Sequence, residues 1–356
     1  MPMLRRLVFL LLLLPLACID PYNVNAPDGE RYLTVEGYIT TDPGPHSIKL
    51  TRTDTYGSAF EGLIRPVVQA TVAVRDSEGL VSFLTETSQG VYETPANFRA
   101  KVGMSYTLQI DLSNGQSYSS LPELVKAVPK MDSVSYRSVS VATDSRLLDR
   151  SGVQLTAHFK DPGDESNFYY WRTGPATFVV VANPELFTLS PNHPTNPRGA
   201  APKDCCAICY YQEQRRVQNF AIGTDVDFNG LSTRKQVTFI EDDGLRFKDT
   251  YRAEVQQMAI SDNAYRFLKL IEQQLSITGS VFDQPPANIR GNMINLADPD
   301  EVVLGYFIAA DIDTKQIYIK RTNLDQKLLQ TPSIIPDDCR IFPGADTAIP
   351  SDWNPN

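Results

Sequence analysis

The residue types best suited to chemistry in this chain are the cysteines of its second half. Cys205, Cys206 and Cys209 are clustered, and Cys339 lies far from them in the sequence. Four thiolates are the ligands of many structural zinc sites, so this set could hold a zinc ion. In an oxidising compartment the same residues pair as two disulfides instead. The choice between these chemistries depends on where the chain resides.

The N-terminal segment indicates the compartment. Two arginines, an apolar run over Leu7–Leu14 and a small residue come in that order before Cys18. The run is shorter than the ~20 residues that cross a bilayer, and it is typical of an export signal. The segment resembles a bacterial lipoprotein signal, although Pro15 stands where that motif usually has leucine. We expect residues 1–17 to be a signal peptide and Cys18 to carry the lipid; the alternative is an ordinary secretory signal with Cys18 in a disulfide.

Export favours disulfides over zinc for the four remaining cysteines. A bond between the adjacent Cys205 and Cys206 would strain the ordinary disulfide geometry. Two pairings of the four disulfide candidates remain, one with Cys205–Cys209 and the other with Cys206–Cys209. In both, Cys339 is tied back to the cluster through the residue left over.

The histidines and one acidic segment are weaker candidates for metal binding than the cysteines are. None of His46, His158 and His193 stands at the short spacing of a histidine metal pair, so no zinc site built on histidine is expected. The residues Asp225, Asp227 and Asn229 copy the opening of an EF-hand calcium loop, with Gly230 at its sixth position. The twelfth position is Gln236 instead of glutamate, and no helix pattern flanks the segment. We expect an acid-rich β-turn there, with calcium binding as the alternative.

Motifs for catalysis are missing from the sequence. It has no Gly-X-Ser-X-Gly elbow, phosphate-binding loop or Gly-X-Gly-X-X-Gly fingerprint, so we expect no catalytic residues and no cofactor. Aromatic residues at Phe168–Trp171 and Tyr210–Tyr211 fall in strand-like runs, where alternate side chains face the core. Packing on the sheet is the commoner role of such residues, but exposed ones anchor interfaces. The interface candidates are therefore Tyr170, Trp171, Tyr210 and Tyr211, with His193 in a neighbouring loop.

The overall composition narrows the class of partner. With 33 Lys and Arg against 42 Asp and Glu, the net charge of −9 argues against nucleic acid, which rewards clustered basic residues. The hydrophobic content is 42%, yet no second apolar run of membrane length follows Cys18. At 356 residues the chain is long enough for two cores. These features predict a soluble two-domain body that hangs from a lipid.

The first predicted domain spans residues 31–128, after a polar tether at 18–30. From Arg31 onward, apolar and polar residues alternate in short runs, the first with Leu33, Val35 and Ile39 on one face. Turn-forming residues separate these runs, and Asn114-Gly115 predicts a two-residue hairpin. About seven short strands in this space are typical of a β-sandwich.

The second predicted domain spans residues 129–330 and is also rich in strands. Its one clear helix is predicted over 262–277, because Ser261 can cap it and Tyr265, Leu268, Ile271 and Leu275 recur at helical spacing before Gly279. The proline-dense segment 183–204 should lack regular structure and form a functional or disordered loop. Residues 331–356 should form a proline-rich tail tied by Cys339.

In the order of these segments along the sequence, the chain resembles a family of outer-membrane lipoproteins from Bacteroidota known as domain of unknown function 4249. The resemblance covers nearly all of the mature chain. The segments that carry it are Leu33–Thr40 with Asp42–Pro45, Gly90–Tyr92, Gly103 with Tyr106, Asp132–Val134 after Pro129, Gly279–Asp283, Gly291–Asn292 and Val303–Phe307.

We expect the first domain to be a transthyretin-like or immunoglobulin-like β-sandwich. The resemblance implies an outer-membrane location, an N-terminal domain similar to transthyretin-like or carboxypeptidase-regulatory sandwiches, and a TonB-dependent transporter as the partner. It implies no catalytic residues. Our leading hypothesis is a non-enzymatic lipoprotein that helps such a transporter to capture or deliver a nutrient, on the cell surface in preference to the periplasmic face. The second hypothesis is an adhesion or envelope-scaffold lipoprotein that binds protein or glycan. A hydrolase with an unrecognised site ranks last.

Overall fold

A computed structural model of the chain describes residues 31–53, 65–142, 149–201, 205–213, 220–276 and 289–355. The predicted signal peptide and tether, with Cys18, lie outside these residues. The described chain is mainly β with one α-helix, which confirms the predicted fold class. In the described part, no helix has the length and apolar character needed to cross a membrane.

Within the described ranges, the strands form three sheets. The largest contains β1 (Leu33–Thr40), β2 (Ser47–Arg52), β3 (Arg65–Pro66), β6 (Thr85–Ser88), β7 (Val91–Glu93), β13 (Phe168–Thr173), β14 (Ala176–Val181), β15 (Ile208–Glu213), β16 (Phe220–Thr224), β18 (Thr250–Ala259) and β20 (Leu304–Lys320). The second contains β4 (Thr71–Asp76), β5 (Val81–Phe83), β8 (Ser105–Asp111), β9 (Ser117–Ser120), β10 (Glu123–Leu124) and β19 (Met293–Asn295). The third contains β11 (Met131–Val141), β12 (Arg150–Lys160) and β17 (Ser232–Glu241).

The first unit is a sandwich between one end of the largest sheet and the second sheet. The alternation predicted for the first strand is confirmed, since Leu33, Val35 and Ile39 are fully buried. They pack against residues such as Leu108 and Ile110 of β8 in a single core. Strands with a period of two bury one face each, so two sheets can close on one another.

The hairpin at Asn114-Gly115 differs from the prediction in the length of its loop. The amide of Leu112 donates to the carbonyl of Gln116, which leaves a three-residue loop between them. Gly115 has φ +86° and its amide donates to the carbonyl of Leu112. A turn followed by a left-handed glycine is the usual three-residue hairpin connection, and it suits Asn-Gly as well as a two-residue turn does.

Strand β20 joins the two units. Its first part, Leu304–Ala310, pairs in parallel with β1, and its second part, Asp311–Lys320, pairs with β18. Phe307 and Ala309 therefore belong to the core of the sandwich, together with Met293 of β19. The first core thus draws on residues far beyond the predicted range 31–128, because a parallel partner for β1 must come from a distant segment.

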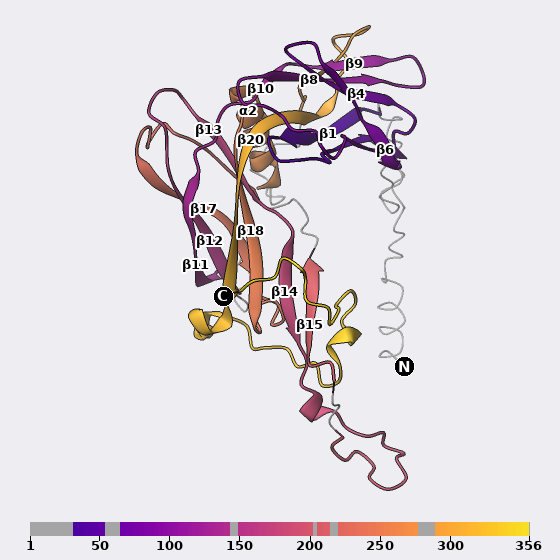
Figure 1. Cartoon of the computed structure of the whole chain (residues 1–356), viewed down its shortest axis with the longest axis vertical. Coiled ribbons are helices and arrows are strands. Elements are labelled where there is room, and N and C mark those ends of the chain that lie inside the picture. The colour runs from indigo at the N-terminus through magenta and orange to yellow at the C-terminus, as the bar shows by residue number, and fades with distance from the viewer. Residues whose placement is uncertain are drawn as a thin grey trace, which may run out of the picture.

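The linker around the predicted boundary at 128/129 is fixed to this same strand. The backbone amide of Val128 donates to Asp311 at 2.9 Å, and that of Met131 donates to Asp313 at 2.8 Å. Lys130 also forms an ion pair with Asp313. These contacts hold the crossing between the units against β20 (Figure 1).

Two glycines allow the close approach of backbone on which this joint depends. Gly305 has φ +80°, and a Cβ added to it would lie 2.0 Å from the carbonyl oxygen of Val35. A Cβ on Gly291 would lie 1.6 Å from the carbonyl oxygen of Gly305. Beside them, the side-chain amide of Asn292 donates to the carbonyl of Phe307 and accepts from its amide, at 2.8 and 2.9 Å.

Alanine at position 305 is expected to lower the free energy of unfolding by about 3 kcal/mol or more, because it adds a clash with β1 to the strain of a left-handed backbone. Gly103 provides a matched control: its φ is +86°, but a Cβ there would meet nothing within 4 Å. Gly103→Ala should cost only the strain, about 1 kcal/mol. Urea unfolding of both variants measures the difference, and equal losses would contradict the clash.

In the second unit, both faces of the largest sheet are covered. Val153, Leu155, Ala157 and Phe159 of β12 are all buried, which confirms the predicted alternation. They face residues of β13, β14 and β18, so the three-stranded sheet covers one side of the largest sheet.

The helix α2 (Asp262–Leu275) covers the opposite side of the largest sheet. Ser261 caps it as predicted, since its side chain accepts a hydrogen bond from the amide of Ala264. Leu268 is buried, whereas Leu275 is 60% exposed. The helix ends at Leu275, with Ser276 as its C-cap, and not at residue 277. Gly279, its predicted stop, lies outside the described residues.

The two units lie at different levels along the longest axis of the molecule (Figure 1). The sandwich occupies one end, and the segment between β14 and β15 projects from the other end. The long strands β18 and β20 run between these ends. The two extremes of the described chain are therefore held apart by a continuous sheet.

Candidate functional site

The segment that projects beyond β14 and β15 is the proline-rich loop of the sequence. Its described residues, up to position 201, contain one short 3-10 helix, η1 (Pro184–Leu186), and a single bridge between Thr188 and Ala200. The amide of Leu189 donates to Gly199, and that of Ala201 donates to Phe187. We call residues 187–201 the proline hairpin. The prediction that this segment lacks all regular structure is wrong in this detail, because non-proline residues at its base still pair across the loop.

The tip of the proline hairpin is polar and exposed. Residues 190–198 read Ser-Pro-Asn-His-Pro-Thr-Asn-Pro-Arg, and all except His193 are exposed. His193, predicted as an interface residue, is half-buried, and its Nδ1 faces the amide of Asn196 at 3.3 Å. The hairpin thus offers hydroxyl, amide and guanidinium groups at one extreme of the molecule (Figure 1).

A disulfide braces the base of the proline hairpin. Cys209 of β15 is bonded to Cys339, and both residues are fully buried. Neither predicted pairing contained this bond, so the predicted connectivity is wrong. The reason is the alternation of β15: Cys209 points into the core where the short helix η4 (Cys339–Ile341) packs. Cys205 and Cys206 precede the strand and remain free thiols.

Residues of the predicted tail cover the aromatic side chains of β15. The ring of Tyr210 lies 5.2 Å from that of Trp353, and the ring of Tyr211 lies 5.0 Å from that of Phe342. Tyr210 also pairs through its backbone with Asp346. These two interface candidates are therefore half-buried under the chain's own C-terminal segment, which they hold in place.

The candidates on β13 are buried as well. Trp171 is 0% exposed and Tyr170 is 6% exposed, so neither can anchor an interface. The prediction assumed that one face of this strand meets solvent. In the structure Trp171 packs under the three-stranded sheet, and Tyr170 packs under α2 on the other face.

The acid-rich segment at 225–230 is a turn, as favoured by the sequence. Asp225 is 2% exposed, and its carboxylate accepts the amide of Asn167 at 2.9 Å. Asp227 and Asn229 are exposed. The amide of Gly230 donates to Asp161 at 3.0 Å, which ties the turn to the neighbouring loop. These contacts give Asp225 a structural role.

The three histidines lie apart in the fold. His46 is 6% exposed in the sandwich, where burial lowers the pKa of its imidazole, and its Nε2 faces the carbonyl of Asp42. His158 lies on β12, where its Nε2 faces the hydroxyl of Ser135 at 2.7 Å. Neither meets the proline hairpin that carries His193.

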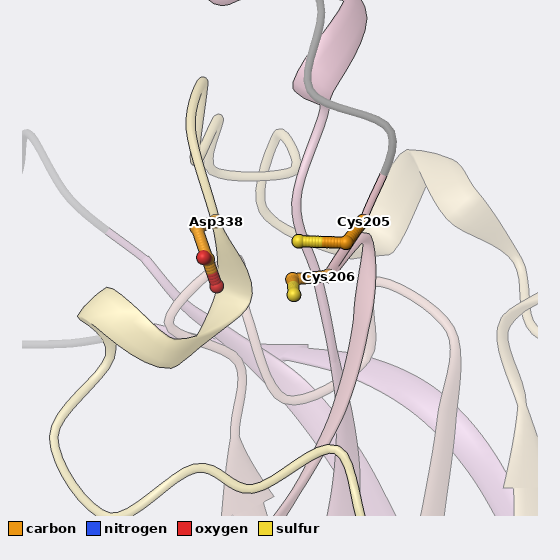
Figure 2. A group of neighbouring side chains, drawn as sticks. All are labelled: Cys205, Cys206 and Asp338. Carbon is orange, nitrogen blue, oxygen red and sulfur yellow. The ribbon is translucent and has the colours of Figure 1, made fainter.

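One group of side chains in the described ranges has donors suited to a metal. The sulfurs of Cys205 and Cys206 and a carboxylate oxygen of Asp338 lie within 4.8 Å of one another. Figure 2 shows them between the start of β15 and the tail. The four-thiolate zinc site, the alternative that the sequence disfavoured, is ruled out here because Cys209 and Cys339 are bonded to each other. No sequence pattern points to Asp338, because only the fold brings it to the thiols.

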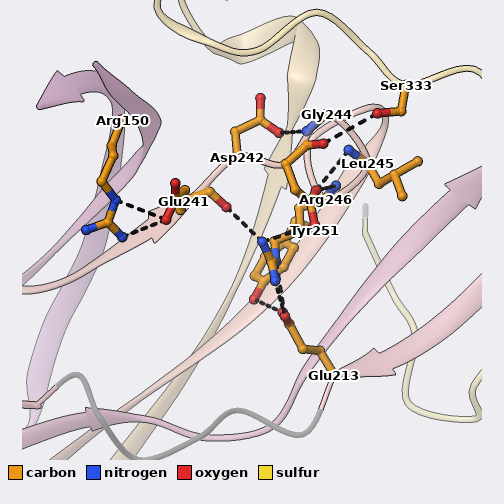
Figure 3. A network of polar contacts seen from close by, with 10 residues as sticks. Arg150, Glu213, Glu241, Asp242, Gly244, Leu245, Arg246, Tyr251 and Ser333 are labelled. Carbon is orange, nitrogen blue, oxygen red and sulfur yellow. Dashed lines mark hydrogen bonds and ion pairs between the residues drawn. The ribbon is translucent and has the colours of Figure 1, made fainter. Parts of the chain in front are cut away.

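A charged network fixes the other end of β15 (Figure 3). Arg246 donates to one oxygen of Glu213 through Nε and Nη2, at 3.0 and 2.6 Å, and the hydroxyl of Tyr251 donates to the other oxygen. Burial alone would lower the pKa of Arg246, but the bonds to Glu213 outweigh it and raise the pKa. Arg246 also donates to the carbonyl of Glu241 on β17. The network joins the two layers of the second unit.

The buried carboxylate of Glu123 joins the sandwich to the second unit. Glu123 of β10 is 2% exposed and accepts hydrogen bonds from the hydroxyls of Tyr306 and Ser261, each at 2.7 Å. Asn292 lies 3.4 Å from the same carboxylate. Burial raises the pKa of Glu123 in spite of these donors. The sequence did not single out Glu123, because its partners come from three distant segments.

The buried Glu123 predicts a pH dependence of stability. Its raised pKa means that the folded chain holds the proton more tightly than the unfolded chain does, so the free energy of unfolding falls as pH rises from the ordinary glutamate pKa through the raised one. Relative to Glu123→Gln, the wild type should lose stability over this window. Urea unfolding at a series of pH values measures the difference.

Glu86 supplies a control of opposite sign. Its pKa is lowered, chiefly by hydrogen bonds from the amides of Gln69 and Gly90. Relative to Glu86→Gln, the wild type should therefore lose stability as pH falls below the ordinary glutamate pKa. The same pH dependence in Glu123→Gln and the wild type would contradict the role of Glu123.

Comparison with known proteins gives one result. The family model described as "Domain of unknown function (DUF4249)" matches residues 19–316. Neither the curated proteins nor the solved structures contain a match to the chain. The matched range takes in the sandwich, the proline hairpin, α2 and most of β20, and so includes most residues of the buried cores. The chain therefore belongs to the DUF4249 family.

Proposed function

We propose that this protein is a lipid-anchored outer-membrane lipoprotein that acts without catalysis, as an accessory to a TonB-dependent transporter in nutrient capture or delivery. The anchor would be Cys18. Support comes from the signal pattern, from family membership and from the arrangement of the two ends of the molecule. The observation that carries the proposal is the position of the proline hairpin, at the extreme opposite the sandwich that follows the tether (Figure 1).

In this proposal the sandwich stays near the membrane and the proline hairpin makes the contact with the partner. The thirteen residues 18–30 of the tether reach at most about 45 Å when fully extended. The disulfide Cys209–Cys339 and the bridge Thr188–Ala200 hold the base of the hairpin in place. A contact element ordered in advance loses less entropy on binding than a free loop does.

The surface of the hairpin suits a polar partner. Its exposed Asn192, Thr195 and Arg198 offer hydrogen-bond donors, and its prolines restrict the backbone. Such a surface matches the hydrated interfaces that polar loops form, where bridging water is common. The loops of a transporter barrel would provide that kind of surface.

Copurification from detergent-solubilised membranes tests the partner. A variant in which a short glycine-serine turn replaces residues 190–198 should lose a large β-barrel that the wild type retains. The double variant Asp227→Asn/Asn229→Ala is the matched control, since it alters another exposed polar turn and should keep the barrel. A wild-type protein that purifies alone in several mild detergents contradicts the proposal.

Location on the cell surface can be tested with the same hairpin. Arg198 is exposed near its tip, so trypsin added to intact cells should cut the chain there. Cleavage only after lysis would place the protein on the periplasmic face instead. Intact-mass measurement of the mature N-terminus would show whether Cys18 carries lipid.

The exposed hairpin also fits an adhesion or scaffold protein that binds protein or glycan. Gene deletion separates the two functions. Loss of growth on a particular nutrient supports uptake, whereas altered attachment or envelope integrity with normal growth supports adhesion or scaffolding.

A further inference from the structure

Two thiols at the base of the proline hairpin are left out of the structural disulfide. Cys205 is exposed and Cys206 is half-buried, and they are neighbours in the chain. Their sulfurs face the same space beside Asp338 (Figure 2). Because the chain already forms an internal disulfide, two adjacent thiols that remain reduced and accessible are candidates for thiol–disulfide chemistry.

The surroundings of the pair favour thiolate chemistry over a bound cation. The carboxylate of Asp338 is 5% exposed and is already paired with Arg340, whose Nε lies 3.0 Å from Oδ1. Nη2 of Arg340 also lies 4.0 Å from Sγ of Cys205. A metal cation would have to displace this guanidinium from its carboxylate, whereas thiol–disulfide exchange at Cys205 leaves the ion pair in place.

The pair is also kept apart from the structural disulfide. Cys209 and Cys339 are both fully buried, so an external thiol has no path to their sulfurs. The carbonyl of Cys206 accepts the amide of Cys339 at 2.9 Å, which fixes the backbone of the pair to the tail. Cys206 has φ +72°, a conformation that non-glycine residues rarely adopt and that surrounding contacts must hold.

We propose that Cys205 and Cys206 form a redox-active dithiol that closes reversibly to a vicinal disulfide in exchange with low-molecular-weight disulfides. The exposed thiolate of Cys205 attacks one sulfur of the external disulfide, whose sulfur–sulfur bond breaks and releases one thiol. Cys206 then attacks Sγ of Cys205, the Cys205–Cys206 bond forms, and the second external thiol leaves. Two electrons and the two thiol protons of the pair pass to the external disulfide, so the step balances.

The adjacency of the two residues makes this disulfide easy to reduce. Cα atoms of neighbouring residues are 3.8 Å apart across a trans peptide, which is below the usual 4.4–6.8 Å for disulfide partners. The resulting strain raises the reduction potential, and strained exposed disulfides are the labile ones. Access supports the order of attack, because Cys205 is the more exposed thiol. The pKa of Cys206 is raised, chiefly by its hydrogen bond with Cys205, so Cys206 stays protonated while Cys205 attacks and gives up its proton before it attacks in the second step.

Differential alkylation with peptide mapping tests the proposal on the full chain. Oxidised glutathione should remove both alkylatable thiols at 205 and 206, with the loss of two hydrogen atoms and no retained glutathione. The variant Cys206→Ser should instead keep one glutathione on Cys205, since nothing resolves the mixed disulfide. Dithiothreitol should reopen the pair at a concentration at least about tenfold below that needed for Cys209–Cys339.

Several results would overturn the proposal. These are a stable glutathione adduct on the wild type, a bond from Cys205 or Cys206 to Cys209 or Cys339, or thiols that stay alkylatable in oxidised glutathione. Retention of one zinc ion per chain, lost in Cys205→Ser and in Asp338→Asn, would assign the cluster to a metal instead. Because Cys206→Ser keeps the structural disulfide, its fold can be checked by circular dichroism in parallel.

Discussion

Replacing Trp171 by alanine is expected to lower the free energy of unfolding by about 3–5 kcal/mol, the usual cost of removing a large aromatic side chain from a core. Its ring is fully buried, 5.4 Å from the ring of Tyr169 and 5.8 Å from that of Phe159. Its Nε1 also donates to Gln257 at 2.7 Å. The variant leaves both a cavity and an unpaired buried amide. Urea unfolding followed by circular dichroism measures the loss.

Trp353 is the matched control, because it is the other tryptophan of the chain and lies half-buried in the tail. Trp353→Ala should lower the free energy of unfolding by no more than about 1.5 kcal/mol, because a half-buried ring removes less apolar area from water than a fully buried one. Full stability of Trp171→Ala, combined with loss of the copurifying barrel, would contradict the buried role and restore Trp171 as an interface residue.

Removing the disulfide is expected to have the second large effect. The double variant Cys209→Ser/Cys339→Ser should lose up to about 5 kcal/mol, because the bond closes a loop with a sequence separation of 130. Both serines are needed, since a single free thiol at either position could pair with Cys205 or Cys206. Thermal and urea unfolding under non-reducing conditions measure the change.

The neighbouring thiols supply the control for this variant. Cys205→Ser/Cys206→Ser also replaces two sulfurs, but Cys205 is exposed and Cys206 only packs against the edge of the core, so the stability should stay within about 1 kcal/mol of the wild type. The tail should also become accessible to protease in the first variant only, near Ile341 and Trp353. Equal stability of the two double variants would show that the Cys209–Cys339 bond does not hold the tail.

Several residues that carry the family resemblance serve the joint between the two units. Gly291 and Gly305 stand where a Cβ would meet backbone, and Asn292 completes the hydrogen bonds of Phe307. None of them lies at the proline hairpin. The segments that carry the resemblance therefore include residues that hold the two units together.

The sequence determined the local features of the fold through side-chain periodicity. Alternation located the buried face of β1 and of β12, and the serine cap with helical spacing located α2. The mainly-β class followed from the same patterns. These features depend on neighbours within a few residues, which is the range that periodicity reports.

Only the tertiary structure decided which distant segments meet. Periodicity shows that Phe168–Trp171 is a strand but not that helix and sheet bury both of its faces. Cysteine spacing narrows the pairing, yet the direction of Cys209 within β15 selects Cys339 and leaves Cys205 and Cys206 beside Asp338. The parallel partner of β1 lies more than two hundred residues away, on β20. Such contacts are fixed by the packing of whole sheets, because each strand carries the same alternating signal whatever its partner.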